Sequence, residues 1–202
     1  MSIQAIYFDI GGVLVRTEDK TPRTRLAARL GMTFEALEEI VFGGDSGRKA
    51  QRGEITAEDQ WAYVCQKVNW PFANWRDLEA EFFAGDRLDE ELVDYIRSLH
   101  RHYKTGVISN ALGDVRTVIL NTWHMSDAFD VLIISAEVGL MKPDVRIFQA
   151  ALNALGVQPA EAVFVDDVAR NVEGARAIGM HAIQFRNTAQ VRAELGELLH
   201  RI

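Results

Sequence analysis

Six side chains that could do chemistry follow short apolar runs in this sequence. They are Asp9, Ser109, Asn110, Lys142, Asp166 and Asp167. In an open α/β sheet, ligands bind beyond the carboxyl ends of the strands, so residues in such places converge on one edge. Three carboxylates gathered there repel one another by several kcal/mol unless a cation neutralises them. The pattern therefore predicts a cation site at the edge of a sheet.

Oxygen ligands of this kind favour Mg²⁺, which prefers one or two carboxylates, a substrate phosphate and retained waters. No Cys or His stands beside these positions, which argues against zinc. A metal between Asp9 and a phosphate would let the carboxylate approach the anion as a nucleophile. The Ser109 hydroxyl and the Lys142 ammonium can hold the other phosphoryl oxygens, and Lys142 also fits as the counterion of Asp9. We therefore expect Asp9, Ser109 and Lys142 to be the catalytic residues.

The elements that must position these residues are short strands alternating with helices. Apolar runs predict buried strands at Ala5–Phe8, Thr105–Ile108, Val131–Ile134, Ala162–Val165 and Ala182–Phe185. Helical periodicity predicts helices near Glu90–His102, Asp114–Thr122, Asp144–Leu155 and Ala169–Ile178. This alternation is typical of an α/β fold with a doubly wound parallel sheet and right-handed crossovers.

One connection is far too long for such a fold. About seventy residues with helical periodicity separate the first strand from the helix near Glu90, whereas ordinary connections are short. We expect a helical insertion over residues 16–86, and a main domain formed by residues 1–15 and 87–202. Thr56 and Asp59 form an expected capping box, and Gly31 and Gly53 are expected to end helices. The insertion should have its own small core, made of Leu26, Leu30, Phe34, Leu37, Ile40, Val41, Trp61, Trp75, Leu78 and Phe82.

Composition narrows the class of protein further. The 202 residues are 48% hydrophobic, enough to bury one large core and one small satellite. The net charge is -7 and the basic residues are scattered, so nucleic acid is not an expected partner. The apolar segment Ile6–Val15 is interrupted by Asp9 and two glycines, so it predicts neither a signal peptide nor a membrane span. Cys65 is the only cysteine and has the helical spacing of a core residue, which favours a reducing cytoplasm and no chemical role.

The sequence resembles the haloacid dehalogenase superfamily in four motifs. Phe8–Leu14 resembles its motif I, Ile108–Asn110 its motif II, Gly139–Asp144 its motif III, and Phe164–Asp167 with Asn171 its motif IV. All four occur in the family's order and span nearly the whole chain. Gln51–Thr56 and Lys142–Phe148 look like the branch that contains a bacterial glucose-1-phosphate phosphatase and the N-terminal phosphatase domain of epoxide hydrolases.

The resemblance implies a Rossmann-like core with a helical cap inserted after the first strand. It implies that Asp9 is the nucleophile and that Mg²⁺ is held by the Asp9 side chain, the Gly11 carbonyl and Asp167, with Asp166 supporting the site. The residues expected to contact the phosphate or the substrate are Gly12, Ser109, Asn110, Lys142 and Arg16. The expected partner is a small phosphate ester, with the protein a monomer or homodimer that does not bind membranes.

The sequence departs from the family at Gly11. The family's phosphatases usually carry a second Asp there, which serves as general acid and base and typically contributes about 10² to 10⁴ in rate. A substrate with a good leaving group, such as a sugar 1-phosphate or a phenyl phosphate, would depend on it less. Alternatively, water or a cap carboxylate would take its place, with Asp45, Glu54 and Glu18 as the candidates.

Two other functions remain open from the sequence. A 2-haloacid dehalogenase would use the same Asp without metal, but that branch does not need the Asp166–Asp167 pair. A catalytically weak phosphate-binding protein would explain Gly11. In the insertion, Gly43–Gly47 with Arg48 and Arg52 is either a mobile substrate loop or a helix-to-helix turn capped by Asp45 or Ser46, and we favour the turn.

Overall fold

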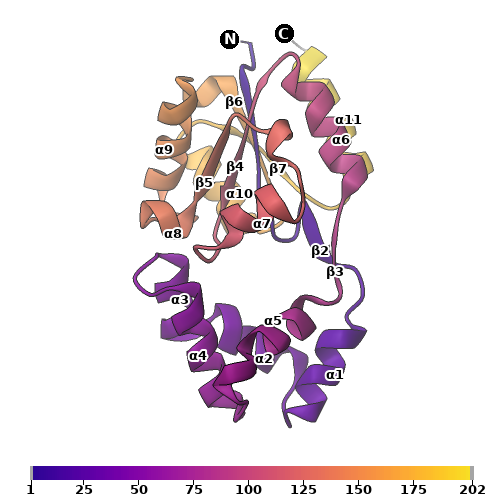
Figure 1. Cartoon of the computed structure of the whole chain (residues 1–202). Coiled ribbons are helices and arrows are strands. Elements are labelled where there is room, and N and C mark those ends of the chain that lie inside the picture. Colours follow the sequence, from indigo (N-terminus) through magenta and orange to yellow (C-terminus); the bar gives the residue numbers. More distant parts are fainter. Residues whose placement is uncertain (1, 201–202) are drawn as a thin grey trace.

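The computed structural model describes residues 2–200, which form a five-stranded sheet flanked by helices and a separate group of helices below it (Figure 1). The sheet is parallel and has the strand order β5-β4-β1-β6-β7. Its strands are β1 (Ala5–Phe8), β4 (Lys104–Ser109), β5 (Val131–Ile134), β6 (Ala162–Asp166) and β7 (His181–Gln184). All five predicted strands are present, with ends that differ from the prediction by at most one residue.

The register of the sheet brings the ends of its central strands together. Phe8 at the end of β1 pairs with Val107 of β4 on one side and with Val165 of β6 on the other. The residues that follow these positions therefore leave the sheet at the same edge. The central strands are buried on both faces, which is why they read as continuous apolar runs in the sequence.

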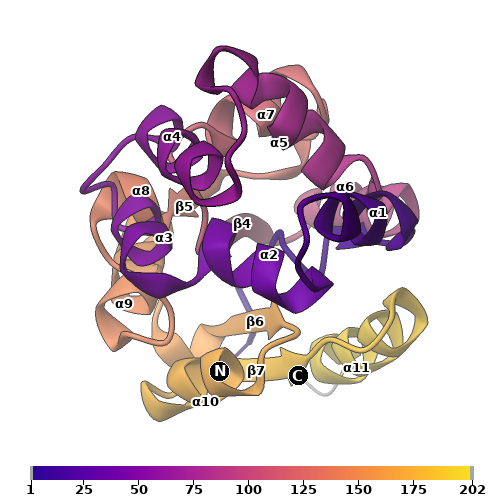
Figure 2. The ribbon, with the colours of Figure 1, turned by 90° about the horizontal axis from the view of Figure 1, so that it is seen from below.

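Helices cover both faces of the sheet. One face packs against α6 (Glu90–His100), α7 (Val115–Asn121), the short 3₁₀ helix η2 (Ser126–Ala128) and α11 (Thr188–His200). The other face packs against α9 (Val145–Leu155) and α10 (Ala169–Ala177), near the short elements α8 (Ser135–Val138) and η3 (Pro159–Glu161). Figure 2 shows α6 and α11 on one side of the sheet and α9 on the other. The prediction of a doubly wound α/β sheet is confirmed.

Local signals set the ends of the predicted helices. The side chain of Asp89 accepts a hydrogen bond from Leu92 N at the start of α6, and Asp144 accepts one from Arg146 N at the start of α9. Helix α9 ends at Gly156, whose φ of +65° favours glycine. Helix α11 was not predicted, because its fully buried side chains, Val191 and Leu195, are too few to make a clear stripe.

The helical group has a core of its own. It contains α1 (Thr21–Arg29), α2 (Phe34–Phe42), α3 (Gly44–Gln51), α4 (Ala57–Val68), the 3₁₀ helix η1 (Phe72–Asn74) and α5 (Trp75–Phe83). The predicted capping box between Thr56 and Asp59 is present at the start of α4. Nine of the ten predicted core residues lie in this cluster or against it. The exception is Phe34, which is only partly buried and has its ring under the side chains of Lys20 and Arg23.

The turn expected at Gly43–Gly47 is shorter than predicted. Gly43 alone separates α2 from α3, and α3 begins at Gly44. Asp45 and Ser46 lie inside α3, and neither side chain caps it. The helix can start this early because the backbone of Gly47 packs against Phe42 at a distance that no Cβ would allow.

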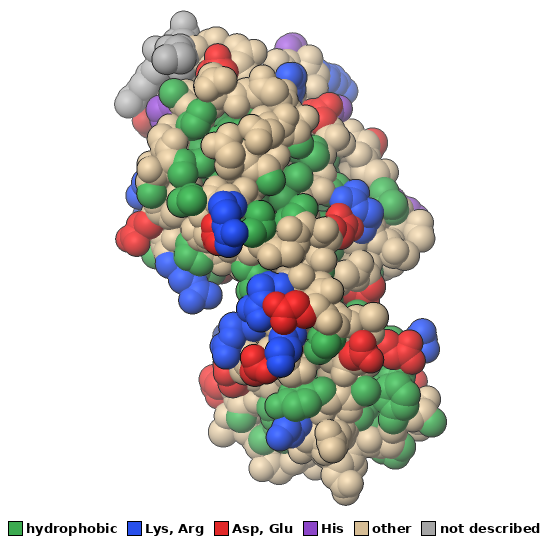
Figure 3. Space-filling view, turned by 90° about the vertical axis from the view of Figure 1, so that its left-hand side faces the viewer, with side chains coloured by type: hydrophobic (Ala, Val, Ile, Leu, Met, Phe, Trp, Pro, Cys, Tyr) green, Lys and Arg blue, Asp and Glu red, His purple; other side chains and the backbone are tan. Residues whose placement is uncertain are grey.

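A two-stranded antiparallel ribbon joins the two parts of the chain. It consists of β2 (Val15–Thr17) and β3 (Asp86–Leu88), and it was not predicted because each strand has only three residues and mixed polarity. The expected boundaries of the insertion, after residues 15 and 86, fall within this ribbon. On the face in Figure 3, Lys and Arg lie interleaved with Asp and Glu at the narrow junction between the two parts. Among the described residues, no helix combines the length and the apolar character that a membrane crossing requires.

Candidate active site

Lys142 lies at the centre of the residues that the sequence analysis selected. Its Nζ atom is 2.8 Å from Oδ2 of Asp9 and 2.7 Å from Oδ2 of Asp166, and its side chain is fully buried. Asp9 follows β1, Asp166 is the last residue of β6, and Lys142 lies in the segment between α8 and α9. The three meet at the same edge of the sheet. A buried ammonium is stable here because two carboxylates share its charge.

Asp9 follows β1 directly and is fixed by hydrogen bonds to the backbone. Asp9 N donates to the carbonyl oxygen of Val165 at 2.9 Å, and Ile10 N donates to Asp9 Oδ1 at 2.7 Å. Burial raises the pKa of Asp9 to about 7, Lys142 opposes the shift, Asp166 adds to it, and the Ser109 hydroxyl opposes it. The side chain thus needs further positive charge to stay fully ionised near neutral pH.

Asp166 is fully engaged by protein groups. Its Oδ1 atom accepts a hydrogen bond from Val168 N at 2.8 Å, and Asn171 Nδ2 lies 3.1 Å from both carboxylate oxygens. With Oδ2 also bonded to Lys142, both oxygens have partners. Asp166 is therefore suited to hold Lys142 in place, and its supporting role at a metal site stays a prediction.

The acidic cluster fits a hard divalent cation. Carboxylate oxygens of Asp9, Asp166 and Asp167 lie within 4.8 Å of one another. Among the described residues, Asp167 Oδ1 and Asn171 Oδ1 are buried and have no hydrogen-bond partner. Burial, and then the nearby Asp166, raise the pKa of Asp167. Three carboxylates against one lysine, with orphaned acceptor oxygens beside them, form a donor set made only of oxygen, as Mg²⁺ prefers.

Two glycines after Asp9 shape this cluster. A Cβ on Gly12 would collide with the Asp167 carboxylate, and its φ of +80° also favours glycine. Gly12 N donates to Val15 O at 2.9 Å, which closes the turn. A Cβ on Gly11 would meet no atom within 4 Å, so the position where family members carry a second acid is open space.

The predicted phosphate-binding pair, Ser109 and Asn110, ends β4. The side chain of Ser109 is almost fully buried, and its hydroxyl helps to lower the pKa of Asp9, which burial raises. Asn110 Nδ2 donates to the Lys142 carbonyl oxygen at 2.9 Å, and Asn110 Oδ1 accepts from Lys142 N at 2.8 Å. The structure thus brings Asp9, Ser109, Asn110, Lys142 and the acidic pair together, although their contact with a substrate stays a prediction.

Arg16 lies in β2, and its guanidinium bonds to residues outside the acidic cluster. Its Nη1 atom is 2.8 Å from both Val13 O and Asp89 Oδ2, and its Nε atom is 2.9 Å from Glu18. Its guanidinium also lies over the ring of Phe185. These contacts tie the ribbon to the sheet domain, and the predicted contact between Arg16 and the substrate stays a prediction.

The three cap carboxylates considered as substitute acids form surface ion pairs. Asp45 pairs with Lys49, Glu54 with Arg52, and Glu18 with Arg16. Hydrogen bonds from Lys49 and Arg52 lower the pKa of Asp45 and of Glu54, respectively. A general acid needs a raised pKa, so these two pairings disfavour that role.

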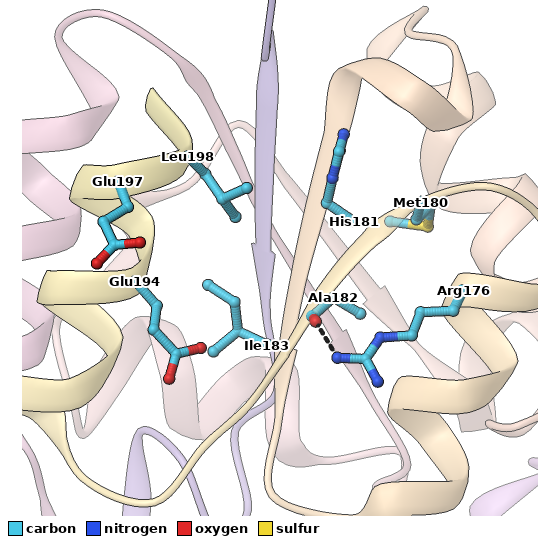
Figure 4. A pocket seen from close by; sticks show the side chains of 8 residues that line it. All are labelled: Arg176, Met180, His181, Ala182, Ile183, Glu194, Glu197 and Leu198. Atoms are coloured by element: carbon cyan, nitrogen blue, oxygen red, sulfur yellow. Dashed lines mark hydrogen bonds between the residues drawn. The ribbon is translucent and has the colours of Figure 1, made fainter. Parts of the chain in front are cut away.

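The surface of the protein has two hollows of note. A groove of about 750 Å³ lies between the helical group and the sheet domain, lined by Gly53–Asp59, Trp75, Arg76, Glu79, Gly113, Asp114, Ala136 and Glu137. A second hollow of about 520 Å³ lies between β7 and α11, with Ile183 and Glu194 on its walls (Figure 4). The acidic cluster lines neither of these hollows.

The parallel sheet thus carries a buried carboxylate, an acidic pair and a lysine at its carboxyl edge. The family model of haloacid dehalogenase-like hydrolases matches residues 3–179. The chain therefore belongs to the haloacid dehalogenase-like hydrolase family, and the resemblance found in the four motifs is confirmed.

Curated relatives of similar length are phosphatases. The chain is 30% identical to Phosphatase MT3486 of Mycobacterium tuberculosis over 210 residues, which cover 95% of this chain and 91% of that protein. It is 26% identical to the D-ribitol-5-phosphate phosphatase of Bacteroides thetaiotaomicron over 223 residues, which cover 98% and 99%. The chain is thus a phosphatase-like hydrolase with an acidic aspartate cluster.

Other relatives are much longer than this chain. It is 27% identical to mouse Acyl-CoA dehydrogenase family member 10 over 98% of its own length but only 19% of that protein. It is 42% identical to rat Bifunctional epoxide hydrolase 2 over 96% of its own length and 38% of that protein. The similarity to an epoxide hydrolase agrees with the branch that the sequence resembles.

A solved structure shares the fold. A haloacid dehalogenase family enzyme from Bacteroides thetaiotaomicron, crystallised with magnesium and inorganic phosphate, superposes with a TM-score of 0.78. The superposition covers 92% of this chain and 95% of that one, at 21% identity. At this identity the comparison bears on the fold alone, and it agrees with a Rossmann-like sheet and an added helical group.

Proposed function

We propose that this protein is a Mg²⁺-dependent phosphatase that hydrolyses a small phosphomonoester through a phosphoryl group carried on Asp9. The observation that carries the proposal is the Lys142 ammonium, which lies between Asp9 and Asp166, the two carboxylates that cluster with Asp167 and its orphaned oxygen. An anion entering this site would find a carboxylate whose negative charge is offset in part by Lys142, which Asp9 shares with Asp166. That arrangement suits nucleophilic attack by a carboxylate on a phosphate.

The chemistry divides between the residues as follows. An Asp9 oxygen attacks phosphorus, forms an acyl phosphate and displaces the leaving-group oxygen. Water then attacks the acyl phosphate, releases inorganic phosphate and returns the carboxylate. Lys142 and the Ser109 hydroxyl hold phosphoryl oxygens and stabilise the charge that develops on them.

Asp9, the Gly11 carbonyl and Asp167 would hold the metal, and Asp166 would orient Lys142. Bound Mg²⁺ would supply positive charge that favours the ionised form of Asp9 and screens it from the phosphate. The support for this assignment is the orphaned Asp167 oxygen and the raised pKa of Asp9, because a cation satisfies the first and reverses the second.

The leaving group is proposed to be a good one, such as the anomeric oxygen of a sugar 1-phosphate or the oxygen of a phenol. The open space at Gly11 supports this choice, since no acid stands there to protonate a poor leaving group. We also propose that residues 16–86 act as a cap domain that sets specificity, because part of this segment lines the groove between the helical group and the sheet domain. A monomer or homodimer in a reducing cytoplasm completes the proposal, and the free, buried Cys65 is compatible with it.

The test is turnover of a panel of monophosphates with Mg²⁺ and with EDTA, together with an Asp9→Asn variant. We expect phosphate release that requires Mg²⁺ and that the variant lacks. Borohydride trapping of the wild type during turnover should convert Asp9 to homoserine, which mass spectrometry locates. Halide release from 2-haloacids in EDTA would instead support the dehalogenase. Phosphate binding without turnover across the panel would support a binding protein.

A further inference from the structure

The side chain of Asn110 joins two segments of the active site. Its Nδ2 atom donates to the Lys142 carbonyl oxygen at 2.9 Å, and its Oδ1 atom accepts from Lys142 N at 2.8 Å. The carboxamide therefore bonds both polar backbone groups of one residue, 32 positions away in the sequence. Such a reciprocal pair fixes the position and the orientation of the Lys142 backbone.

Lys142 needs an anchor of this kind. A lysine side chain is a flexible four-carbon stem that ends in a point charge, so the place of its ammonium depends on where the backbone starts. Here the ammonium must reach Asp9 and Asp166 at once, at 2.8 and 2.7 Å. A small displacement of the backbone would lengthen one of these contacts and leave a buried carboxylate without its partner.

The residue that follows Asn110 is bonded to Ser135, the first residue of α8. Ala111 N, the next group along the chain, donates to Ser135 Oγ at 3.0 Å. The Ser135 hydroxyl donates in turn to the carbonyl oxygen of Ala111 at 3.3 Å, and Ser135 is completely buried. Asn110, directly after β4, is thus followed by a residue that is itself fixed by two hydrogen bonds to Ser135.

We propose that Asn110 is a positioning residue, whose side chain acts on phosphate through Lys142 and not by direct contact. The proposal rests on the proposed function for the identity of the ligand, and it changes the role expected from the sequence. Both the amide nitrogen and the amide oxygen of Asn110 are bonded to the Lys142 backbone. Removal of the carboxamide should therefore act by moving the Lys142 ammonium. A direct phosphate ligand would act independently of Lys142.

A double-mutant cycle separates these two roles. Binding of inorganic phosphate in the presence of Mg²⁺ would be measured by calorimetry for the wild type, Asn110→Ala, Lys142→Ala and the double variant. With Lys142 present, Asn110→Ala should weaken binding by about 5- to 30-fold, the effect of one or two lost hydrogen bonds. With Lys142→Ala already in place, it should change binding less than about twofold. An equal loss in both backgrounds would overturn the proposal.

A second measurement needs no phosphate binding and so stands apart from the proposed function. Reductive methylation of Lys142, followed by mass spectrometry, reports how well its ammonium is held. The wild type should be protected, Asn110→Ala should be methylated faster, and Asn110→Asp should lie between them because it keeps the acceptor for Lys142 N. Protection that is equal in all three proteins would contradict the proposal. If the wild type binds no phosphate while methylation follows this order, the proposed function fails and the positioning role stands.

Discussion

A Cβ atom on Gly53 would collide with the carbonyl oxygen of Ala136, so the backbone of the helical group rests directly on α8. The φ of Gly53 is +69°, which adds a conformational reason for glycine. We predict that Gly53→Ala lowers the stability for two reasons. The left-handed backbone costs about 1 kcal/mol with a side chain, and the collision with Ala136 adds a further loss. Urea unfolding would measure the loss of stability.

Gly31 is a matched control for this change. Its φ is +73°, but a Cβ there would meet no atom within 4 Å. Gly31→Ala should therefore cost only the backbone strain. Equal losses of stability in the two variants would show that the contact between Gly53 and Ala136 is not tight.

Asp167 is predicted to destabilise the protein when no metal is bound. Its pKa is raised in the folded state, so the ionised side chain costs stability above the pKa that it has in the unfolded chain. Asp167→Asn should raise the melting temperature of the metal-free protein at neutral pH. It should also abolish the rise in melting temperature that Mg²⁺ produces in the wild type.

Differential scanning fluorimetry with EDTA and with Mg²⁺ would make this comparison. Asp77→Asn, which changes an exposed carboxylate of α5, serves as the control and should leave the Mg²⁺ effect intact. A metal-dependent shift that survives in Asp167→Asn would remove Asp167 from the metal site.

Gly11→Asp tests the consequence of the missing acid. Because a Cβ at this position meets no atom within 4 Å and the φ of Gly11 is not positive, the change should be tolerated. It should speed the hydrolysis of alkyl phosphates by tenfold or more, against a full contribution of roughly 10² to 10⁴ from a positioned acid, and change the hydrolysis of aryl phosphates much less. Steady-state kinetics on paired alkyl and aryl substrates would decide. Gly11→Asn, of nearly the same size without the acid, should give no such gain, and an unchanged alkyl rate in Gly11→Asp would contradict the account.

The free edge of β7 is closed by side chains. Phe185 N donates to Asp166 O, so the backbone N–H and C=O groups of alternate residues point toward β6. Those of Ala182 and Gln184 point away from β6, toward the edge of the sheet. Arg176 Nη2 donates to Ala182 O at 2.7 Å, the bond drawn in Figure 4, and Gln190 Nε2 lies 3.2 Å from Gln184 O. Such bonds occupy acceptors that a strand from another molecule would need.

We predict that Arg176→Ala combined with Gln190→Ala promotes association between copies of the chain. Sedimentation velocity over a range of concentrations should show larger species than the wild type forms. Arg170→Ala, which removes an exposed charge from the same helix α10, controls for the loss of charge alone. Identical sedimentation of all three proteins would show that these bonds do not guard the edge.

The sequence predicts the sheet and the acidic cluster because both rest on local patterns. Each buried strand is an apolar run, and Asp9 and Asp166–Asp167 stand at the ends of such runs, where topology gathers them. The ribbon β2–β3 escapes prediction because three residues carry no periodic signal. The pairing of Asn110 with Lys142 and that of Arg16 with Asp89 escape it as well, since each depends on a contact between distant residues.

The antiparallel ribbon gives the helical group one further property. Val15 pairs with Leu88 and Thr17 with Asp86, so the chain departs from the sheet domain and comes back to it through neighbouring strands. A segment whose two ends already touch can be lengthened, shortened or exchanged for an unrelated one with little strain on the five parallel strands. The scaffold that holds Asp9 and Lys142 can thus stay constant in evolution while the helical group is exchanged for another.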